Sequence, residues 1–199
     1  GWSNIHAMND IVRDIIQSQE ILTVASLSAN AGAGGAIMAL AADYVVARSG
    51  VILNPHYKTL GLHGSEYWTY LLPKRVGKEK AHEIMDNCLP LGAIRANKIG
   101  LVDLVLSENE NNFRDELEKF CEKLASDDEF YDLLDKKNEI RQKDEAFKPL
   151  QQYRDEELAY MYESFYNKNS LFNKLRCEFV YKVSPTNTPK RLAQHRIED

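Results

Sequence analysis

The chain has 199 residues, of which 44% are hydrophobic and 28% charged, with a formal net charge of −5. This length and composition suit one soluble domain, or one domain with an extension. No basic patch interrupts the acidic balance, so a nucleic-acid partner is not expected. The longest apolar run, at residues 36–42, is far shorter than the ~20 residues that cross a bilayer, so a membrane partner is not expected either.

Thiols and imidazoles indicate a reducing compartment and no metal site. The three cysteines, Cys88, Cys121 and Cys177, are odd in number and widely scattered. This pattern argues against a disulfide framework and against a structural zinc site, and it favours a cytoplasmic protein. His56 and His63 flank one loop, but a metal site needs three or four converging ligands. We therefore expect no metal.

The first hundred residues alternate between helical and strand patterns. Apolar residues at spacings of three and four predict a helix over 4–16, and short apolar runs predict strands over 21–27, 44–47 and 51–53. A glycine-rich turn over 30–35 leads into a predicted buried helix at 36–42. Helical patterns return at 65–73 and 78–87, and residues 101–106 alternate as a strand does. This alternation predicts an α/β fold.

The character of the chain changes near residue 108. Apolar residues from Phe113 to Leu124 form a helical stripe, and Leu158, Met161, Tyr162 and Phe165 mark a further helix. No strand pattern follows residue 108. We therefore predict two parts, an α/β core over 1–108 and an all-helical extension over 109–199.

The turn at residues 30–35 suggests a chemical role. A strand that passes through glycines into a helix leaves free backbone N–H groups at the helix start, where they stabilise an anion or a developing oxyanion. Gly32, Gly34 and Gly35 supply that pattern and permit close approach of a ligand. A tight turn packed on a sheet would use the same residues. The G-x-G-x-x-G spacing of a dinucleotide site is absent.

The residues around the turn are more specific than the turn alone. Residues 28–43 read S-A-N-A-G-A-G-G-A-I-M-A-L-A-A-D, and residues 99–103 read I-G-L-V-D. This pattern resembles the signature of the crotonase (enoyl-CoA hydratase/isomerase) superfamily. The resemblance implies a crotonase-like α/β core that binds acyl-CoA, partial because the early strands and the first oxyanion donor are missing. It assigns the second oxyanion-hole N–H to Gly34, with Gly32 and Gly35 contacting the substrate.

The same resemblance implies that ordinary hydratase activity is lost. Hydratases use two glutamates, one three residues after the oxyanion glycine and one fourteen residues after the closing aspartate. These positions hold Ile37 and Tyr57 in this sequence. Isoleucine cannot transfer a proton, and a tyrosine with an ordinary pKa of about 10 is a poor base near neutrality. We therefore expect no hydration of enoyl-CoA.

A second set of motifs resembles one crotonase subfamily, the hydrogenase maturation proteins. The set comprises N-P-H-Y-K at 54–58, G-S-E-Y-W at 64–68, F-V-Y-K at 179–182, T-P at 188–189 and L-A-Q-H-R at 192–196. This resemblance implies a larger protein whose amino-terminal module, missing here, transfers a formyl group from formyl-tetrahydrofolate to coenzyme A. The crotonase-like module would then release carbon monoxide from formyl-CoA for nickel–iron hydrogenase, with the hydrogenase maturation machinery as a partner.

Decarbonylation moves the formyl proton to the departing sulfur and needs a dry site. We expect Glu66, if buried, to have a raised pKa and to move this proton. Tyr57 would hydrogen-bond to the carbonyl oxygen or the sulfur, and His56 would contact the substrate. Each catalytic assignment has a plainer interpretation. Glu66 would be an acid in the first turn of a helix, and Tyr57 a packed tyrosine.

Two functions of other classes stay open. One is a different acyl-CoA reaction, such as thioester hydrolysis, and the other is a non-catalytic module that binds coenzyme A or a partner. A dry pocket between Tyr57 and Glu66 favours decarbonylation, an ordered water favours hydrolysis, and a pocket filled by side chains favours the binding module. Lys74, Arg75 and Lys78 would contact the phosphates of coenzyme A or form a solvated helix face.

Overall fold

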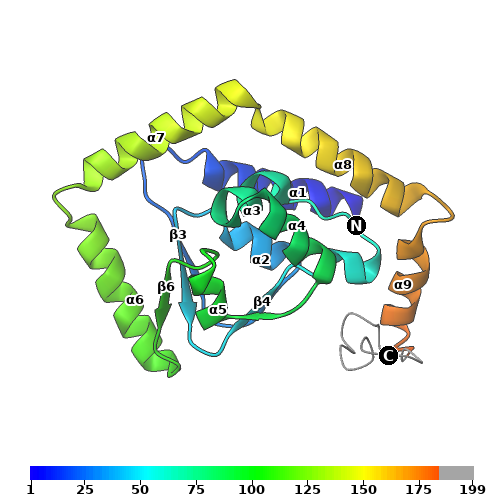
Figure 1. Cartoon of the computed structure of the whole chain (residues 1–199), viewed down its shortest axis with the longest axis horizontal. Helices are drawn as coiled ribbons and strands as arrows, with labels where there is room; N and C mark the ends of the chain where they lie inside the picture. Colours follow the sequence, from blue (N-terminus) through cyan, green and yellow to red (C-terminus); the bar gives the residue numbers. More distant parts are fainter. Residues whose placement is uncertain (184–199) are drawn as a thin grey trace.

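The computed structural model describes residues 1–183, which contain two small sheets surrounded by helices (Figure 1). The motifs at 188–189 and 192–196 lie outside these residues. The first sheet is parallel throughout, in the order β1 (Val24–Leu27), β3 (Tyr44–Arg48) and β6 (Leu104–Leu106). In the second, β4 (Ile52–Asn54) pairs in parallel with β2 (Ala31–Gly32) and antiparallel with β5 (Leu91–Gly92). The mainly parallel pairing confirms the predicted α/β class.

One helix precedes these strands and further helices connect them. They are α1 (Trp2–Ile16), α2 (Gly34–Ala39), α3 (Trp68–Val76), α4 (Lys78–Asn87) and α5 (Ala93–Lys98), with a 3-10 turn, η1 (Tyr57–Leu60), after β4. Strand β3 lies in the centre of the core, since its residues Val45, Val46 and Ala47 are fully buried. Parallel strands are covered on both faces, so this continuous apolar run is what a central strand requires.

Asp43, which ends the crotonase-like signature, joins the start of the sheet. Its Oδ2 accepts hydrogen bonds from the backbone N–H and the hydroxyl of Thr23, at 2.7 and 2.8 Å, just before β1. The same oxygen forms an ion pair with Lys137 at 2.7 Å. Asp43 therefore has a structural role, because its carboxylate links the start of the first strand to the third strand and to a helix far along the chain.

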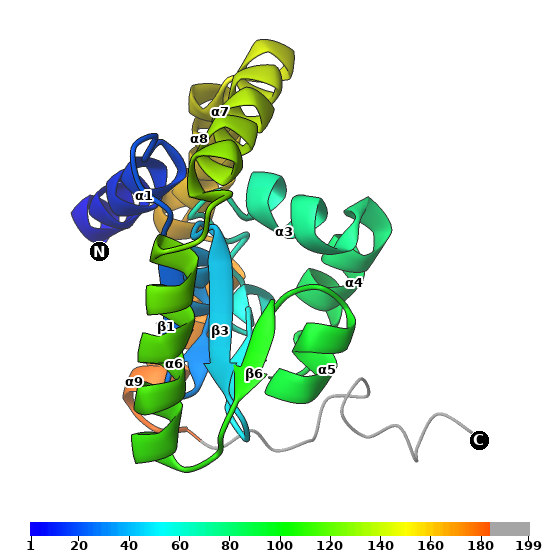
Figure 2. The same cartoon turned by 90° about the vertical axis from the view of Figure 1, so that its left-hand side faces the viewer.

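Up to residue 183, four helices follow the core and form an arch around it in Figure 1: α6 (Glu110–Ala125), α7 (Phe130–Phe147), α8 (Leu150–Tyr166) and α9 (Leu171–Val180). Figure 2 shows α6 running alongside the first sheet, and it packs on β3 and β6. Helix α8 packs on α1 and α3, and α9 on η1. The predicted all-helical extension is confirmed for the described residues after 108, whereas the boundary itself stays a prediction.

Several predicted boundaries were wrong by a few residues. The first and last of the predicted strands are shorter than predicted, β3 extends one residue further, β4 is shifted by one residue, and α2 begins at Gly34 instead of residue 36. Helix α3 begins at Trp68 instead of residue 65, because Gly64, Glu66 and Tyr67 have φ angles of 94°, 63° and 61°. A left-handed backbone cannot continue a right-handed helix. Glu66 is therefore not an acid of the first helical turn, which removes the plainer interpretation of this residue.

Candidate active site

Tyr57 and Glu66 form a direct pair inside the protein. Tyr57 lies in η1 and is 5% exposed, and Glu66 lies in the loop before α3 and is 1% exposed. The Tyr57 hydroxyl donates a hydrogen bond to Oε2 of Glu66 over 2.5 Å. The loop between η1 and α3 thus brings together the two residues that the sequence singled out as catalytic.

Burial sets the protonation behaviour of this pair. Burial raises the pKa of Glu66 above its usual value, although the hydrogen bond from Tyr57 acts in the opposite direction. Burial, and then the charge of Glu66, hold the pKa of Tyr57 well above 10. The phenol therefore keeps its proton near neutrality, and the carboxyl is the group of the pair that exchanges one.

Gly34 lies against the same carboxyl. A Cβ atom placed on Gly34 would be 2.7 Å from Cε of Met8, 3.2 Å from Cδ of Glu66 and 3.3 Å from its Oε1. A Cβ atom there would force the Met8 methyl group and the Glu66 carboxyl to shift, so glycine suits the start of α2 this close to Glu66. Within the described part of the chain, the Gly34 N–H at the start of α2 donates to no protein acceptor. This N–H is free to bind a ligand oxygen.

The three residues assigned to substrate binding fall into two groups. Gly32 and His56 contact each other, since a Cβ atom on Gly32 would be 2.9 Å from Nε2 of His56. The other ring nitrogen of His56 lies 3.2 Å from the hydroxyl of Thr59. Gly35 faces open space, with no atom within 4 Å of a Cβ placed there. The structure thus joins Gly34, Tyr57 and Glu66 in one cluster and leaves the contacts of the other three with substrate as predictions.

Two buried polar residues that the sequence analysis missed hold this cluster. Asn9 on α1 accepts a hydrogen bond from the backbone N–H of Glu66 over 3.2 Å, and it is fully buried. Glu157 on α8, also fully buried, accepts hydrogen bonds from the N–H of Tyr67 and of Thr69, each over 2.8 Å. A signal was present, because both residues interrupt an apolar helical stripe. Burial raises the pKa of Glu157 to about 7.

Other candidates have structural roles in the described residues. Ile37, at a hydratase glutamate position, is 1% exposed within the hydrophobic core. Trp68 and Leu71 belong to the same core. His63 stacks on Tyr160 with ring centroids 4.5 Å apart. Residues 1–183 contain no group of three or more potential metal ligands.

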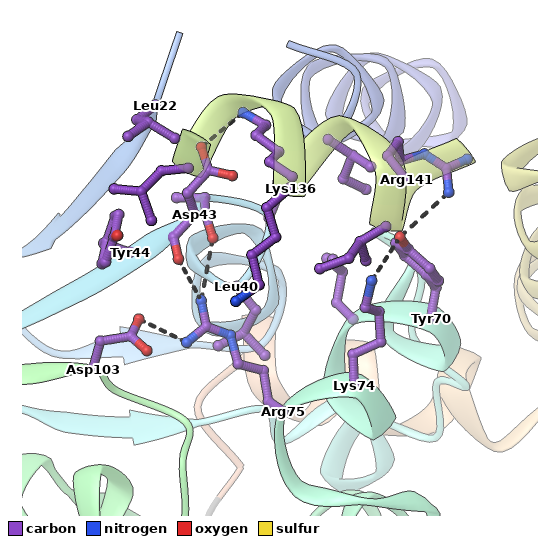
Figure 3. A pocket seen from close by; sticks show the side chains of 17 residues that line it. Leu22, Leu40, Asp43, Tyr44, Tyr70, Lys74, Arg75, Asp103, Lys136 and Arg141 are labelled. Carbon is purple, nitrogen blue, oxygen red and sulfur yellow. Dashed lines mark hydrogen bonds and ion pairs between the residues drawn. The ribbon is translucent and has the colours of Figure 1, made fainter. Parts of the chain in front are cut away.

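A cavity of about 450 Å³ lies away from the Tyr57–Glu66 pair, next to the C-terminal end of α2 (Figure 3). Most of the basic side chains that line this cavity are paired with carboxylates. Lys74 pairs with Asp144, and Arg75 pairs with Asp103 over 2.7 Å. Figure 3 shows Arg75 reaching the backbone next to Asp43 as well. These pairs do not favour the idea that Lys74 and Arg75 bind the phosphates of coenzyme A.

Comparison with known proteins identifies the family. The sequence profile of the enoyl-CoA hydratase/isomerase family matches residues 6–185. This chain belongs to that family. A solved enoyl-CoA hydratase/isomerase from Pseudoalteromonas atlantica superposes with a TM-score of 0.75 at 22% identity, over 89% of this chain and 68% of that one. At this identity the likeness shows the fold alone, and it confirms the crotonase-like architecture.

The resemblance to hydrogenase maturation proteins is also confirmed. The chain is 45% identical to the hydrogenase maturation factor HoxX of Bradyrhizobium diazoefficiens, over 98% of this chain and 35% of that protein. It superposes on HypX from Aquifex aeolicus, solved with tetrahydrofolic acid, with a TM-score of 0.91 at 41% identity, over 98% of this chain and 35% of that one. The chain thus spans about a third of these relatives. Within residues 1–183 no helix is both long and apolar enough to cross a membrane.

Proposed function

We propose that this chain binds coenzyme A thioesters at Gly34 and decarbonylates formyl-CoA, which supplies carbon monoxide for hydrogenase maturation. The observation that carries the proposal is the buried Tyr57–Glu66 pair in contact with Gly34. Similarity to HoxX and HypX supports the place in maturation. The solved relative with tetrahydrofolic acid supports a formyl-tetrahydrofolate step elsewhere in the longer protein.

The reaction balances without a metal or an oxidant. The formyl C–H and C–S bonds break, the carbon leaves as carbon monoxide, and the sulfur leaves as a thiolate. Glu66 takes the formyl proton and passes it to the sulfur, which gives the free thiol of coenzyme A. Tyr57 orients the carboxyl and hydrogen-bonds to the reacting group. The Gly34 N–H polarises the thioester oxygen.

The direct contact between Tyr57 and Glu66 leaves no room between the two groups for a substrate or for a hydrolytic water, so substrate would have to reach the pair from the side of Gly34. The hydroxyl and the carboxylate are 2.5 Å apart, so no water fits between them. A non-catalytic role in binding coenzyme A is the second candidate. It is favoured by the packing of side chains around Gly34, where the Met8 methyl group and the Glu66 carboxyl take up the space that a Cβ atom would need.

The test measures carbon monoxide release from formyl-CoA with a haem-protein reporter. It uses the full-length protein, because the chain spans 35% of its matched relatives. Glu66→Gln should lower turnover by roughly 10²–10⁴-fold with little change in coenzyme A binding, as expected for a lost acid–base group. Tyr57→Phe should also lower turnover while the ring keeps its packing. Undiminished gas release by both variants would refute these roles.

A further inference from the structure

The backbone that carries Glu66 is strained. Glu66 and Tyr67 are consecutive non-glycine residues in the left-handed region, with φ angles of 63° and 61°. Side chains disfavour this conformation, so it persists only where surrounding contacts enforce it. The strain has a geometric effect, because the chain turns sharply between the loop and α3 just where the carboxyl of Glu66 meets Tyr57 and Gly34.

One side chain of the helical extension enforces this turn. Oε2 of Glu157 accepts a hydrogen bond from the N–H of Tyr67 over 2.8 Å. Oε1 of Glu157 accepts hydrogen bonds from the N–H and the hydroxyl of Thr69, over 2.8 and 2.6 Å. The carboxylate thus bridges the last left-handed residue and the second residue of α3. It caps this helix from a distance of 88 residues in the sequence, a task that usually falls to a local side chain.

The position of Glu157 is itself fixed. One turn earlier on α8, Arg154 forms an ion pair with Asp10 of α1 over 2.6 Å and hydrogen-bonds to the backbone oxygen of His6 over 3.3 Å. Helix α1 also supplies Asn9, which accepts a hydrogen bond from the N–H of Glu66. The turn at Glu66 is therefore held from both sides by two helices that are joined to each other.

We propose that Glu157 is a positioning residue for the chemistry at Glu66. It fixes the left-handed turn and thereby sets the Glu66 carboxyl against Tyr57 and Gly34. The hydrogen bonds of Glu157 go to Tyr67 and Thr69. Glu157 acts through the backbone of Tyr67 and Thr69. This inference rests on the proposed function for its kinetic effect, but its geometric effect stands separately. It gives the helical extension a specific part in catalysis.

The experiment replaces Glu157 by Gln in the full-length protein and follows formyl-CoA turnover and coenzyme A binding. The amide has one acceptor where the carboxylate has two, so the hydrogen bond to Tyr67 or to Thr69 is lost. We expect kcat for carbon monoxide release to fall roughly 10–100-fold, the range for a catalytic group displaced by about 1 Å. The dissociation constant of coenzyme A should stay within about twofold, because the Gly34 N–H is untouched.

Glu163→Gln is the matched control, since Glu163 lies on the same helix, is exposed and is remote from the turn in sequence. It should behave as the wild type. If Glu157→Gln does not fold, Thr69→Val removes only the hydroxyl hydrogen bond and should lower kcat by a few-fold at unchanged coenzyme A binding. Wild-type kcat in Glu157→Gln, or in Thr69→Val where that variant must be used, would overturn the inference.

A second readout separates this inference from the proposed function. If the wild-type protein releases no carbon monoxide, the proposed function fails. The positioning role of Glu157 is then tested by comparing crystal structures of the wild type and of Glu157→Gln. Loss of the hydrogen bond between the Tyr57 hydroxyl and Glu66 in the variant would support a positioning role. An unchanged pair with unchanged φ angles at Glu66 and Tyr67 would contradict it.

Discussion

Gly34 illustrates how much a single residue constrains this site. An added Cβ would be 2.7 Å from the Met8 methyl and 3.2 Å from the Glu66 carboxyl carbon. Methionine can move aside, but the buried carboxyl is held by Tyr57 and by its own backbone. Gly34→Ala should therefore lower formyl-CoA turnover by at least roughly 10²-fold, the loss typical of a disturbed oxyanion donor. Gly92→Ala is the control, because a Cβ there meets nothing within 4 Å. Equal turnover in the two variants would contradict the assignment of Gly34.

Glu157 provides a prediction about pH at the same scale. Burial raises its pKa to about 7 in the folded protein, from 4.5 as the ordinary value. The folded state then holds a proton that the unfolded chain has released, so this contribution to stability is complete below about pH 4.5 and is lost as the pH rises through about 7. The shift corresponds to roughly 3 kcal/mol.

Urea unfolding between pH 5 and 8 measures this effect. The wild type should lose stability more steeply with rising pH than Glu157→Gln, in which the titrating group is gone. Comparison of slopes cancels the contributions of groups that the two proteins share, and it cancels the fixed cost of the lost hydrogen bond. Parallel slopes for the two proteins would show that Glu157 does not take up a proton in this range.

At the scale of elements, Asp43 connects β1, β3 and α7. It accepts hydrogen bonds from Thr23 and pairs with Lys137, whose side chain is 14% exposed. Asp43→Ala would leave the N–H of Thr23 and a largely buried ammonium group without this partner. We expect a loss of about 1–3 kcal/mol in the free energy of unfolding, measured by urea denaturation. Coenzyme A binding should persist, because Asp43 lies beyond the carboxyl end of α2 and Gly34 begins that helix. Asp135→Ala, on the exposed face of α7, should cost little.

The sequence predicted the longer helices and strands of the core because their apolar periodicity reflects local packing, but it missed the short helix α5 and the two-residue strands β2 and β5. It also named Gly34, Tyr57 and Glu66, through motifs that resemble those of a family. It placed Glu66 in a helix, because G-S-E-Y-W reads as a helix start and nothing local in it demands a left-handed backbone. The two residues that impose this turn, Asn9 and Glu157, lie 57 and 91 positions from Glu66 in the sequence. Periodicity carries no information on such distant pairs.

At the scale of the whole molecule, the helical extension packs directly on the core. Helix α8 contacts α1 and α3, and it contributes Glu157 and Arg154 to the support of the site. The arch in Figure 1 is thus connected to the loop that carries Glu66. Since the chain spans 35% of HoxX and HypX relatives, the remaining part of those proteins is where a formyl donor would be used under the proposed function.

Under the proposed function, the site splits formyl-CoA to carbon monoxide and excludes water from the reaction. The most direct measurement gives the full-length protein ¹³C-formyl-CoA and quantifies labelled carbon monoxide and labelled formate in the same reaction. We predict that labelled carbon monoxide accounts for nearly all of the coenzyme A thiol released, with formate a minor product. Labelled formate in place of carbon monoxide would contradict the claim and identify a thioester hydrolase, and intact formyl-CoA would identify a binding module.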